Sequence, residues 1–280
     1  MPIVGSEPAS LDRSFGREAF GADPANYHAA RPPYPQAAWE ALVQRAGLRA
    51  GIDIIEIGAG TGLATLPLLA HDPAQLLAIE PDVRLATFLA NSVADPRLEV
   101  IAESFEEIEP APASFDLAVS ATAFHWLDAV PALRRIHSLL RDGGSVALIW
   151  NVFGDSSRPD PFHDATTQLF EGHRVSTSSG GSDRPPFALD EAARLADFAA
   201  AGFAADAPQF LRWTLALDPD GVRALYATYS NVTALPAHEQ TRLLDTLHDV
   251  AAQQFAGRVE RNMITAIYTA RRAQDARPAA

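Results

Sequence analysis

Three glycines at alternate positions form the part of this 280-residue chain that is best suited to bind a ligand. Gly58, Gly60 and Gly62 follow an apolar run that ends in Glu56 and Ile57, and they precede a stretch that predicts a helix. Glycine lets the backbone approach a ligand closely, and a helix N-terminus adds N–H donors and a positive dipole. The segment therefore predicts a loop that holds a nucleotide-like ligand between a strand and a helix.

The spacing of these glycines argues against a nicotinamide dinucleotide site. The dinucleotide fingerprint G-x-G-x-x-G would place its third glycine at position 63, which is Leu63 in this chain. Glu80 ends the next apolar run, about 20 residues beyond the loop, where a carboxylate can accept hydrogen bonds from two ribose hydroxyls. The pair predicts a site for a nucleotide-like ligand with a ribose, and an NAD(P)-dependent oxidoreductase stays as an alternative.

Short apolar strands that alternate with helical stretches position this loop. Strands are predicted at residues 52–57, 76–79, 98–102, 117–120 and 145–150, and helices at 36–46, from about 62, at 83–93 and at 129–140. Repeated strand–helix units of this kind predict an α/β fold with a mostly parallel sheet covered by helices on both faces. Pro67 falls inside the helix expected from residue 62 and should bend it.

The second half of the chain begins with a different composition. Residues 151–186 are rich in Gly, Ser, Asp and Pro, which predicts a mobile loop or lid. Beyond it we expect a helix at 189–201, a strand at 209–216, helices at 221–230 and 238–256 and a last strand at 263–270. We interpret residues 1–280 as a single domain, divided into a cap with the first helix (1–46), a ligand-binding core (47–150), a lid with a helix (151–208) and C-terminal strands with a helical insertion (209–280).

The segment Glu56–Gly62, which reads E-I-G-A-G-T-G, resembles the first motif of class I S-adenosylmethionine-dependent methyltransferases. The resemblance implies a Rossmann-like seven-stranded, mostly parallel sheet with an N-terminal cap and helical lid insertions. It also implies S-adenosyl-L-methionine as cofactor and S-adenosyl-L-homocysteine as product. Residues 103–105 would frame the adenine, although Ala102 and Glu103 stand where the family often has Gly-Asp. The expected cofactor-binding residues are Tyr27, Arg31, Glu56, Gly58, Ala59, Gly60, Gly62, Glu80, Pro81, Glu103, Ser104, Phe105 and Ser120.

Two further segments resemble the branch of that family that acts on small molecules. Residues 27–35 (Y-H-A-A-R-P-P-Y-P) and 123–128 (A-F-H-W-L-D) are similar to segments of methyltransferases related to trans-aconitate methyltransferase. Arg31 could hold the methionine carboxylate while Tyr27 closes over the sulfonium, or the two could simply stabilise the cap. The leucine–arginine–aspartate–glycine–glycine segment at 140–144 resembles the turn before the family's fifth strand.

His125 is the candidate catalytic residue, since imidazole can accept a proton near neutral pH as the methyl group arrives. Alternatively, His125 and Trp126 only pack under the cofactor and shape the pocket. Residues of the 151–186 segment, among them Arg158, Arg174 and Arg184, could cover the substrate together with Tyr226 and Asn231, and Arg174 or Arg212 could attract an acidic one. The expected substrate residues are His125, Trp126, Trp150, Asn151 and Tyr229.

Composition restricts the remaining function classes. A formal net charge of −13 without a basic block argues against nucleic acid, and a small-molecule methyl acceptor is the expected partner. The absence of cysteine excludes disulfides and thiolate sites, and the absence of lysine excludes Schiff-base chemistry.

We predict no metal, because His125 and Asp128 lack a third ligand. Without an apolar span or leader pattern we expect a cytoplasmic protein, not bound to membrane, whose oligomeric state is not predicted. A non-catalytic cofactor-binding protein is a second alternative.

Overall fold

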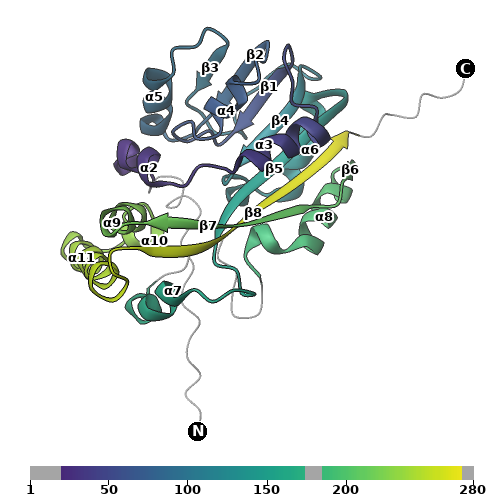
Figure 1. Ribbon diagram of the computed structural model, residues 1–280. Coiled ribbons are helices and arrows are strands. Elements are labelled where there is room, and N and C mark those ends of the chain that lie inside the picture. Colours follow the sequence, from purple (N-terminus) through teal and green to yellow (C-terminus); the bar gives the residue numbers. More distant parts are fainter. Residues whose placement is uncertain (1–19, 174–184, 273–280) are drawn as a thin grey trace, which may run out of the picture.

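One mixed β-sheet organises the computed structural model, which describes residues 20–173 and 185–272 (Figure 1). Five strands run parallel in the order β3-β2-β1-β4-β5, and β8 (Val259–Arg272) lies antiparallel beside β5. The parallel strands are β1 (Asp53–Ile57), β2 (Gln75–Ile79), β3 (Leu98–Ile101), β4 (Phe115–Ala121) and β5 (Leu140–Phe153). The α/β fold with a mostly parallel sheet is therefore confirmed.

The sheet has eight strands and not the seven expected, because its last position is divided. β6 (Phe203–Ala205) pairs with residues 270–272 of β8, and β7 (Gln209–Leu217) pairs with residues 259–267 of the same edge. Between them the backbone N–H of Asp206 still donates to Thr269, whose hydroxyl donates back to the Asp206 carboxylate. Pro208 then follows without an N–H to offer, so the ladder breaks and restarts.

Helices cover both faces of the sheet, as expected. Successive strand residues point to opposite faces, so Ile54 packs in one hydrophobic cluster and Ile55 in the other. The Ile54 cluster contains α3 (Gln36–Ala41) with the π-helical turn η2 (Leu42–Ala46), α4 (Thr65–Leu69) and a side chain of α5 (Val83–Ser92). The Ile55 cluster contains α6 (Ala129–Leu139) and α8 (Glu191–Ala200).

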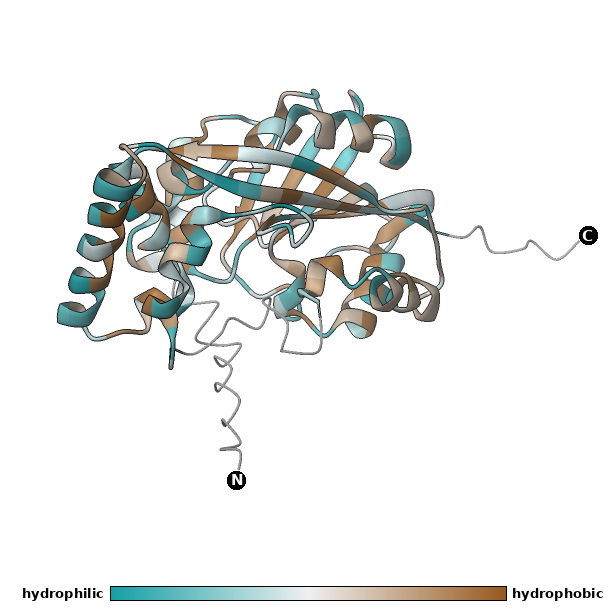
Figure 2. Ribbon diagram, turned by 60° about the horizontal axis from the view of Figure 1, so that its bottom comes forward, coloured by the Kyte–Doolittle hydropathy of each residue, from teal (hydrophilic) through white to brown (hydrophobic). Residues whose placement is uncertain are grey.

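A third hydrophobic cluster lies at the far end of β7 and β8 (Figure 1). We call it the helical module; it consists of α7 (Pro161–Thr166), η4 (Thr167–Phe170), α9 (Pro219–Tyr226), α10 (Ser230–Thr233) and α11 (Ala237–Gln254). In α11, the long helix at the left of Figure 2, Leu243, Leu247 and Ala251 are buried. The unpredicted helix α2 (Pro24–Ala30) lies between α5 and α9, and so connects the module to the sheet's helices.

Several predicted boundaries were wrong for local reasons. The loop expected at 151–186 contains the end of β5 and helix α7, whose first turn is capped by Asp160; its segment 174–184 lies outside the described residues. The helix expected at 221–230 ends at Tyr226, and a new one starts at Ser230. Pro67 produces no interior bend, because α4 begins at Thr65 and the N–H groups in the first turn of a helix have no hydrogen-bond partner within the helix.

The turn expected at 140–144 is a bulge inside β5. Leu140 pairs with Phe115 and Ser145 with Leu117, so the four residues between them on β5 face a single residue, Asp116, on β4. Arg141 of this bulge forms ion pairs with Asp116 at 2.6 Å and with Asp53 on β1 at 2.7 Å. The bulge therefore ties the amino-terminal ends of three strands together, at the edge opposite the glycine loop.

Candidate active site

Two adjoining hollows lie where β1, β2, β4 and β5 end. β1 and β4 are neighbours in the sheet although β2 and β3 come between them in the chain, and parallel sheets bind ligands at such a crossover point. The first hollow, the glycine-loop cleft, encloses about 900 Å³ including open solvent, and its lining lies between residues 27 and 127. The second, the aromatic cavity, encloses about 1460 Å³ and is lined largely by residues 122–126, 150–153 and the helical module.

The glycine loop needs its glycines for two different reasons. Gly58, Gly60 and Gly62 all have positive φ angles, of 74°, 57° and 93°. A Cβ atom on Gly58 would lie 2.3 Å from the Cβ of Ala123, and one on Gly62 would lie 2.6 Å from a methyl group of Leu89. A Cβ on Gly60 would meet nothing within 4 Å. Gly58 and Gly62 thus allow the loop to pack, while Gly60 keeps space open beside the backbone.

Glu80 fixes the loop from the end of β2. Its side chain is 5% exposed, with one carboxylate oxygen accepting from the N–H of Gly60 at 2.8 Å and the other from the N–H of Asp82 at 2.9 Å. A carboxylate held by two backbone donors keeps one orientation and retains lone pairs for a ligand. The carboxylate is therefore held in one orientation in the lining of the cleft.

Glu56 lies deeper in the cleft and is almost fully buried, with 1% exposure. Its Oε2 accepts from the hydroxyl of Thr65 at 2.6 Å, whereas its Oε1 has no hydrogen-bond partner among the described residues. Burial raises the pKa of Glu56 to about 8, and the charge of Glu80 acts in the same direction while the Thr65 hydroxyl opposes it. Oε1 is thus a buried acceptor that a cationic or N–H-bearing ligand would satisfy.

The two hollows differ in charge. Glu56, Glu80 and Glu106 line the glycine-loop cleft, and no arginine is among its described lining residues. Arg31 and Arg261 line the aromatic cavity, and no carboxylate is among its described lining residues. The cleft therefore suits a ligand with positive charge, and the cavity suits one with negative charge.

Tyr27, Thr122 and Trp126 line both hollows and form the wall between them, which we call the junction. Thr122 follows β4 with a φ angle of 55°, a region that β-branched residues strongly disfavour. Its Oγ1 lies 2.7 Å from the hydroxyl of Tyr34, and its N–H donates to Ile149 at 2.7 Å. Strain of about 1–3 kcal/mol is typical of such a backbone and is often found at functional sites.

His125 lines the aromatic cavity next to the junction and is 6% exposed. The indole N–H of Trp150 donates to its Nδ1 at 3.2 Å, and the imidazole packs 4.6 Å from the ring of Trp126. An indole nitrogen can only donate, so Nδ1 must be the acceptor and the neutral ring carries its proton on Nε2. The arrangement makes His125 a hydrogen-bond donor through Nε2.

A family model that describes a methyltransferase domain matches residues 55–148, which carry the glycine loop, Glu80 and the junction residues of β4. These residues form a methyltransferase domain of the class I S-adenosylmethionine-dependent type. The chain is 27% identical over 254 residues to an uncharacterized methyltransferase of Schizosaccharomyces pombe, covering 89% of this chain and 95% of that one. It is 32% identical over 174 residues to a malonyl-acyl-carrier-protein O-methyltransferase of Dechloromonas aromatica, covering 58% and 57%.

Solved structures support the fold of the methyltransferase. A protein of Anaeromyxobacter dehalogenans, provisionally described as a type II methyltransferase, superposes with a TM-score of 0.62 over 88% of this chain and 99% of its own. At 23% identity this likeness concerns the fold alone. It extends beyond residues 55–148 and therefore includes elements of the second half.

The expected cofactor-binding residues of the methyltransferase are brought together only in part. The residues that line the cleft are Tyr27, Glu56, Gly58, Ala59, Gly60, Glu80, Pro81 and Phe105. Ser120 instead donates to the carbonyl of Ile57 inside the sheet, and Ser104 donates to Glu107. Gly62, Glu103 and Ser104 are not among the lining residues, whereas Glu106 is.

Arg31 lies in the aromatic cavity and not in the cleft, where a methionine carboxylate was expected to meet it. Its guanidinium stacks between the rings of Tyr27 and Tyr229, at 5.0 Å and 5.2 Å, and donates to the carbonyl of Thr228 at 2.8 Å. The expected substrate residues His125, Trp126, Trp150, Asn151 and Tyr229 all line the same cavity. Asn151 also donates to the carbonyls of Pro32 and Pro33, so it holds the N-terminal segment over the strand ends.

Of the arginines considered for covering or attracting the substrate, Arg158 and Arg212 are not among the described lining residues of the cavity. Arg158 donates to Trp213 and Thr214, and Arg212 pairs with Asp155 at 3.2 Å. Arg174 and Arg184 lie outside the described residues. Sequence reasoning missed Tyr34, Thr122 and Arg261, although an arginine beside the apolar run after residue 262 was a signal that a charge is buried there. Tyr226 and Asn231 line the cavity.

The described part of the chain shows no cluster of three or more His, Asp or Glu side chains that could hold a metal ion. Within the same residues, no helix is long and apolar enough to cross a membrane.

Proposed function

We propose that the chain transfers a methyl group from S-adenosylmethionine in the glycine-loop cleft to a small-molecule acceptor in the aromatic cavity. The observation that carries this proposal is the junction, since Tyr27, Thr122 and Trp126 border both hollows. When bound, S-adenosylmethionine supplies a methyl group on a positively charged sulfur, which leaves without needing a proton. A cleft lined by carboxylates and a cavity lined by guanidinium groups suit a cationic donor and an anionic or neutral acceptor.

The cleft offers a contact for each part of the cofactor. The Glu80 carboxylate, already oriented by the Gly60 N–H, accepts hydrogen bonds from the ribose hydroxyls. Oε1 of Glu56, which is buried without a partner, accepts from the methionine ammonium group. The open space at Gly60 admits the chain between ribose and methionine, and Phe105 packs against the adenine.

A small molecule fits the second hollow better than a polymer. Side chains of α7, η4, α9 and α10 form part of the wall of the aromatic cavity, so that an acceptor bound there lies between the strand ends and the helical module. The formal net charge of −13 also opposes the binding of nucleic acid. The relatives, which bear the names of different or uncharacterized methyltransferases, leave the acceptor to be identified from the cavity itself.

Positioning does most of the catalysis in this proposal. Placing two reactants in line can supply roughly 7–11 kcal/mol of barrier reduction. The strained Thr122 backbone, its bond to Tyr34 and the rings of Tyr27 and Trp126 hold the junction in shape. His125 donates a hydrogen bond from Nε2 to the acceptor, which orients it, and does not act as a general base from that nitrogen.

Calorimetry and product analysis test the proposal together. We expect S-adenosylmethionine and S-adenosylhomocysteine to bind the full chain, and Glu80→Gln to weaken both by roughly 10- to 100-fold through the loss of charge-assisted bonds. NADH or NADPH binding in preference would instead support an oxidoreductase. A screen of phenols, N-heterocycles and acids with methyl-labelled cofactor then measures transfer by mass spectrometry. Cofactor binding with no transfer to any of these classes would favour a non-catalytic cofactor-binding protein.

A further inference from the structure

A ladder of stacked side chains runs along one wall of the aromatic cavity, from the junction to its deep end. Arg31 lies between Tyr27 and Tyr229, with its guanidinium carbon 5.0 Å and 5.2 Å from the two ring centres. The ring of Tyr229 then packs 4.8 Å from that of Tyr226, and Arg261 lies 5.8 Å from the Tyr226 ring. Two cations therefore face the cavity, one beside the junction and the other several side chains away from it.

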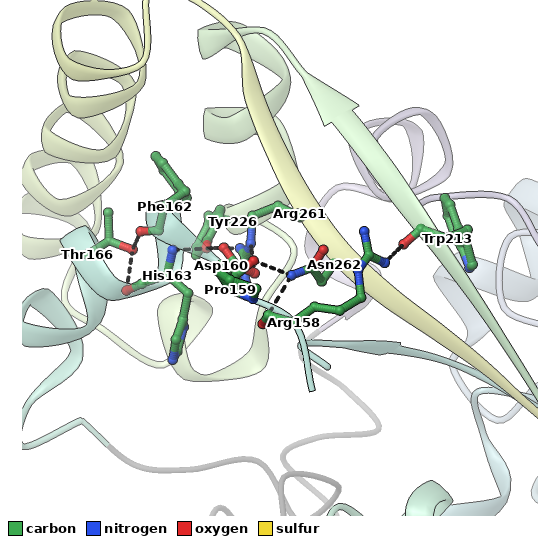
Figure 3. A network of polar contacts seen from close by, with 10 residues as sticks. All are labelled: Arg158, Pro159, Asp160, Phe162, His163, Thr166, Trp213, Tyr226, Arg261 and Asn262. Carbon is green, nitrogen blue, oxygen red and sulfur yellow. Dashed lines mark hydrogen bonds and ion pairs between the residues drawn. The ribbon is translucent and has the colours of Figure 1, made fainter. Parts of the chain in front are cut away.

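The deep end of this ladder is a buried polar network (Figure 3). Arg261 is 4% exposed, and its Nε donates to Asp160 at 3.0 Å while one Nη donates to the hydroxyl of Tyr226. Asn262 donates to the carbonyl of Pro159 at 2.6 Å and so fixes the segment that carries Asp160. The third guanidinium nitrogen, Nη2, has no hydrogen-bond partner among the described residues. Arg261 thus lines the cavity, and its Nη2 can donate hydrogen bonds to a ligand.

A second donor lies beside it. The hydroxyl of Tyr229 is buried and has no hydrogen-bond partner among the described residues, although Tyr229 lines the cavity between Arg31 and Arg261. Burial raises the pKa of Tyr229, so this hydroxyl keeps its proton at neutral pH and can donate. Buried hydroxyls without partners are uncommon, and one that borders a cavity points to a ligand acceptor.

The charge around these donors defines the ligand further. Arg31 and Arg261 both line the cavity in a protein of net charge −13, and Arg261 is paired with Asp160 through Nε. The Nη2 of Arg261 and the Tyr229 hydroxyl are two donors, one of them on a cation, and they match the two oxygens of a carboxylate, whereas a phosphate dianion would need more donors. The remaining wall is aromatic and suits a flat, conjugated body; its rings belong to Trp126, Trp150, Phe153, Phe170, Tyr226 and Tyr229.

We propose that the methyl acceptor is a small aromatic carboxylic acid whose carboxylate binds Nη2 of Arg261 and the hydroxyl of Tyr229. This inference rests on the proposed function and adds the substrate class and its orientation. Because Arg261 lies at the deep end and the methyl group arrives at the junction, the carboxylate is a handle and stays unmethylated. The reacting atom, a hydroxyl oxygen or a nitrogen at the other end of the ring, loses its proton to water as it takes the methyl group, so the product keeps its negative charge.

Calorimetry of the full chain saturated with S-adenosylhomocysteine tests the handle without needing turnover. Benzoate should bind at least about 10-fold more tightly than benzamide, which has the same shape without the charge. Phenyl phosphate should bind no more tightly than benzoate. Equal binding of benzoate and benzamide, or no detectable binding of benzoate, would overturn the proposal. Tighter binding of phenyl phosphate would overturn the assignment to a carboxylate.

Single-atom and charge variants locate the site. Tyr229→Phe should weaken benzoate binding roughly 10-fold through loss of one bond to a charged group and leave benzamide unchanged. The matched control is Tyr268→Phe, which removes a buried hydroxyl that donates to Ala188. Arg261→Gln should abolish the preference for benzoate, with Arg158→Gln as the arginine control from the same network. Arg261 is paired and buried, so the Arg261→Gln variant could fail to fold. In that case Tyr229→Phe tests the proposal alone, and unchanged benzoate affinity in Tyr229→Phe contradicts it.

The product distinguishes a handle from an acceptor. With 4-hydroxybenzoate and S-adenosylmethionine we expect the methoxy acid, which is retained on an anion exchanger, and a methyl ester would contradict the orientation. Failure of the proposed methyl-transfer function is measured separately. If that function is wrong, calorimetry with S-adenosylmethionine alone, with no carboxylic acid added, should show no binding.

Discussion

Trp150 donates its indole N–H to Nδ1 of His125 across 3.2 Å, within the wall of the aromatic cavity. The bond fixes the proton of the neutral imidazole on Nε2, which makes the ring a donor. His125→Gln keeps a side-chain donor, so we expect kcat to fall by less than about 10-fold, the effect of a weakened neutral hydrogen bond. Loss of a general base would cost about 10²- to 10⁴-fold. Steady-state rates with the true acceptor decide, and His125→Leu, which has no donor, should be the slower variant.

The raised pKa of Glu56 predicts that cofactor binding releases a proton. Burial raises this pKa from 4.5 to about 8, so the carboxyl is mostly protonated at pH 7. An ammonium group beside Oε1 favours the ionised form, and affinity should therefore rise as the pH increases towards about 8. Calorimetry in two buffers of different ionisation enthalpy should show release of up to about one proton at pH 7. Glu56→Gln should bind without proton release; release that persists in this variant would assign the proton to another group.

The same shift has a consequence for folding. Because the folded-state pKa of Glu56 lies above its ordinary value, ionisation opposes the folded state. The contribution of Glu56 to stability is therefore full below about pH 4.5 and is lost as pH rises through about 8. Urea unfolding of the ligand-free protein should show that Glu56→Gln removes this part of the pH dependence. A wild-type and variant pair with parallel pH profiles would contradict it.

Gly58 and Gly60 should respond differently to the same substitution. Gly60→Ala places a methyl group in open space at a φ of 57°, which should cost about 1–2 kcal/mol of stability and weaken S-adenosylmethionine binding by filling the cleft. Gly58→Ala adds a collision with the Cβ of Ala123 and should destabilise more. Urea unfolding and calorimetry measure the two effects. Ala123→Gly should partly restore the stability of Gly58→Ala and do nothing for Gly60→Ala.

Thr122 offers a direct measure of the strain at the junction. Thr122→Gly and Thr122→Ala both remove the hydroxyl that contacts Tyr34, but only glycine tolerates a φ of 55° without penalty. We expect the glycine variant to be the more stable of the two by roughly 1 kcal/mol in urea unfolding. Both variants should lose methyl-transfer activity because the junction loses its hydroxyl. Equal stability of the two would mean that the Thr122 backbone is not strained in solution.

The sequence was informative where a site depends on neighbours in the chain. The glycine loop and Glu80 could be predicted because their spacing is local and each comes directly after a strand. The backbone strain at Thr122 could not, since nothing in a threonine codes for a positive φ. Arg261 could not be placed either, because its partner Asp160 comes 101 residues earlier and the two meet only after β8 has joined the sheet.

Some elements were missed because tertiary packing overrides local composition. The proline- and glycine-rich stretch before residue 36 contains α2, which a proline at its first position and the Asp23 cap make possible. The sequence predicts β7 as a strand but β6 as a loop, since a three-residue strand leaves no periodic pattern. Both elements also depend on contacts with distant parts of the chain, α2 with α5 and α9, and β6 and β7 with β8.

The helical module is carried on the ends of β7 and β8, beyond the parallel strands, and it supplies much of the wall of the aromatic cavity (Figure 1). The glycine-loop cleft takes no lining residue from it. Under the proposed function, mutations in α7, α9 and α10 can therefore alter which molecule is accepted while the donor site stays intact. Proteins that descend from a common ancestor with this chain could acquire new acceptors through changes in the second half of the sequence alone. Selection for binding of the same donor would keep the first half unchanged.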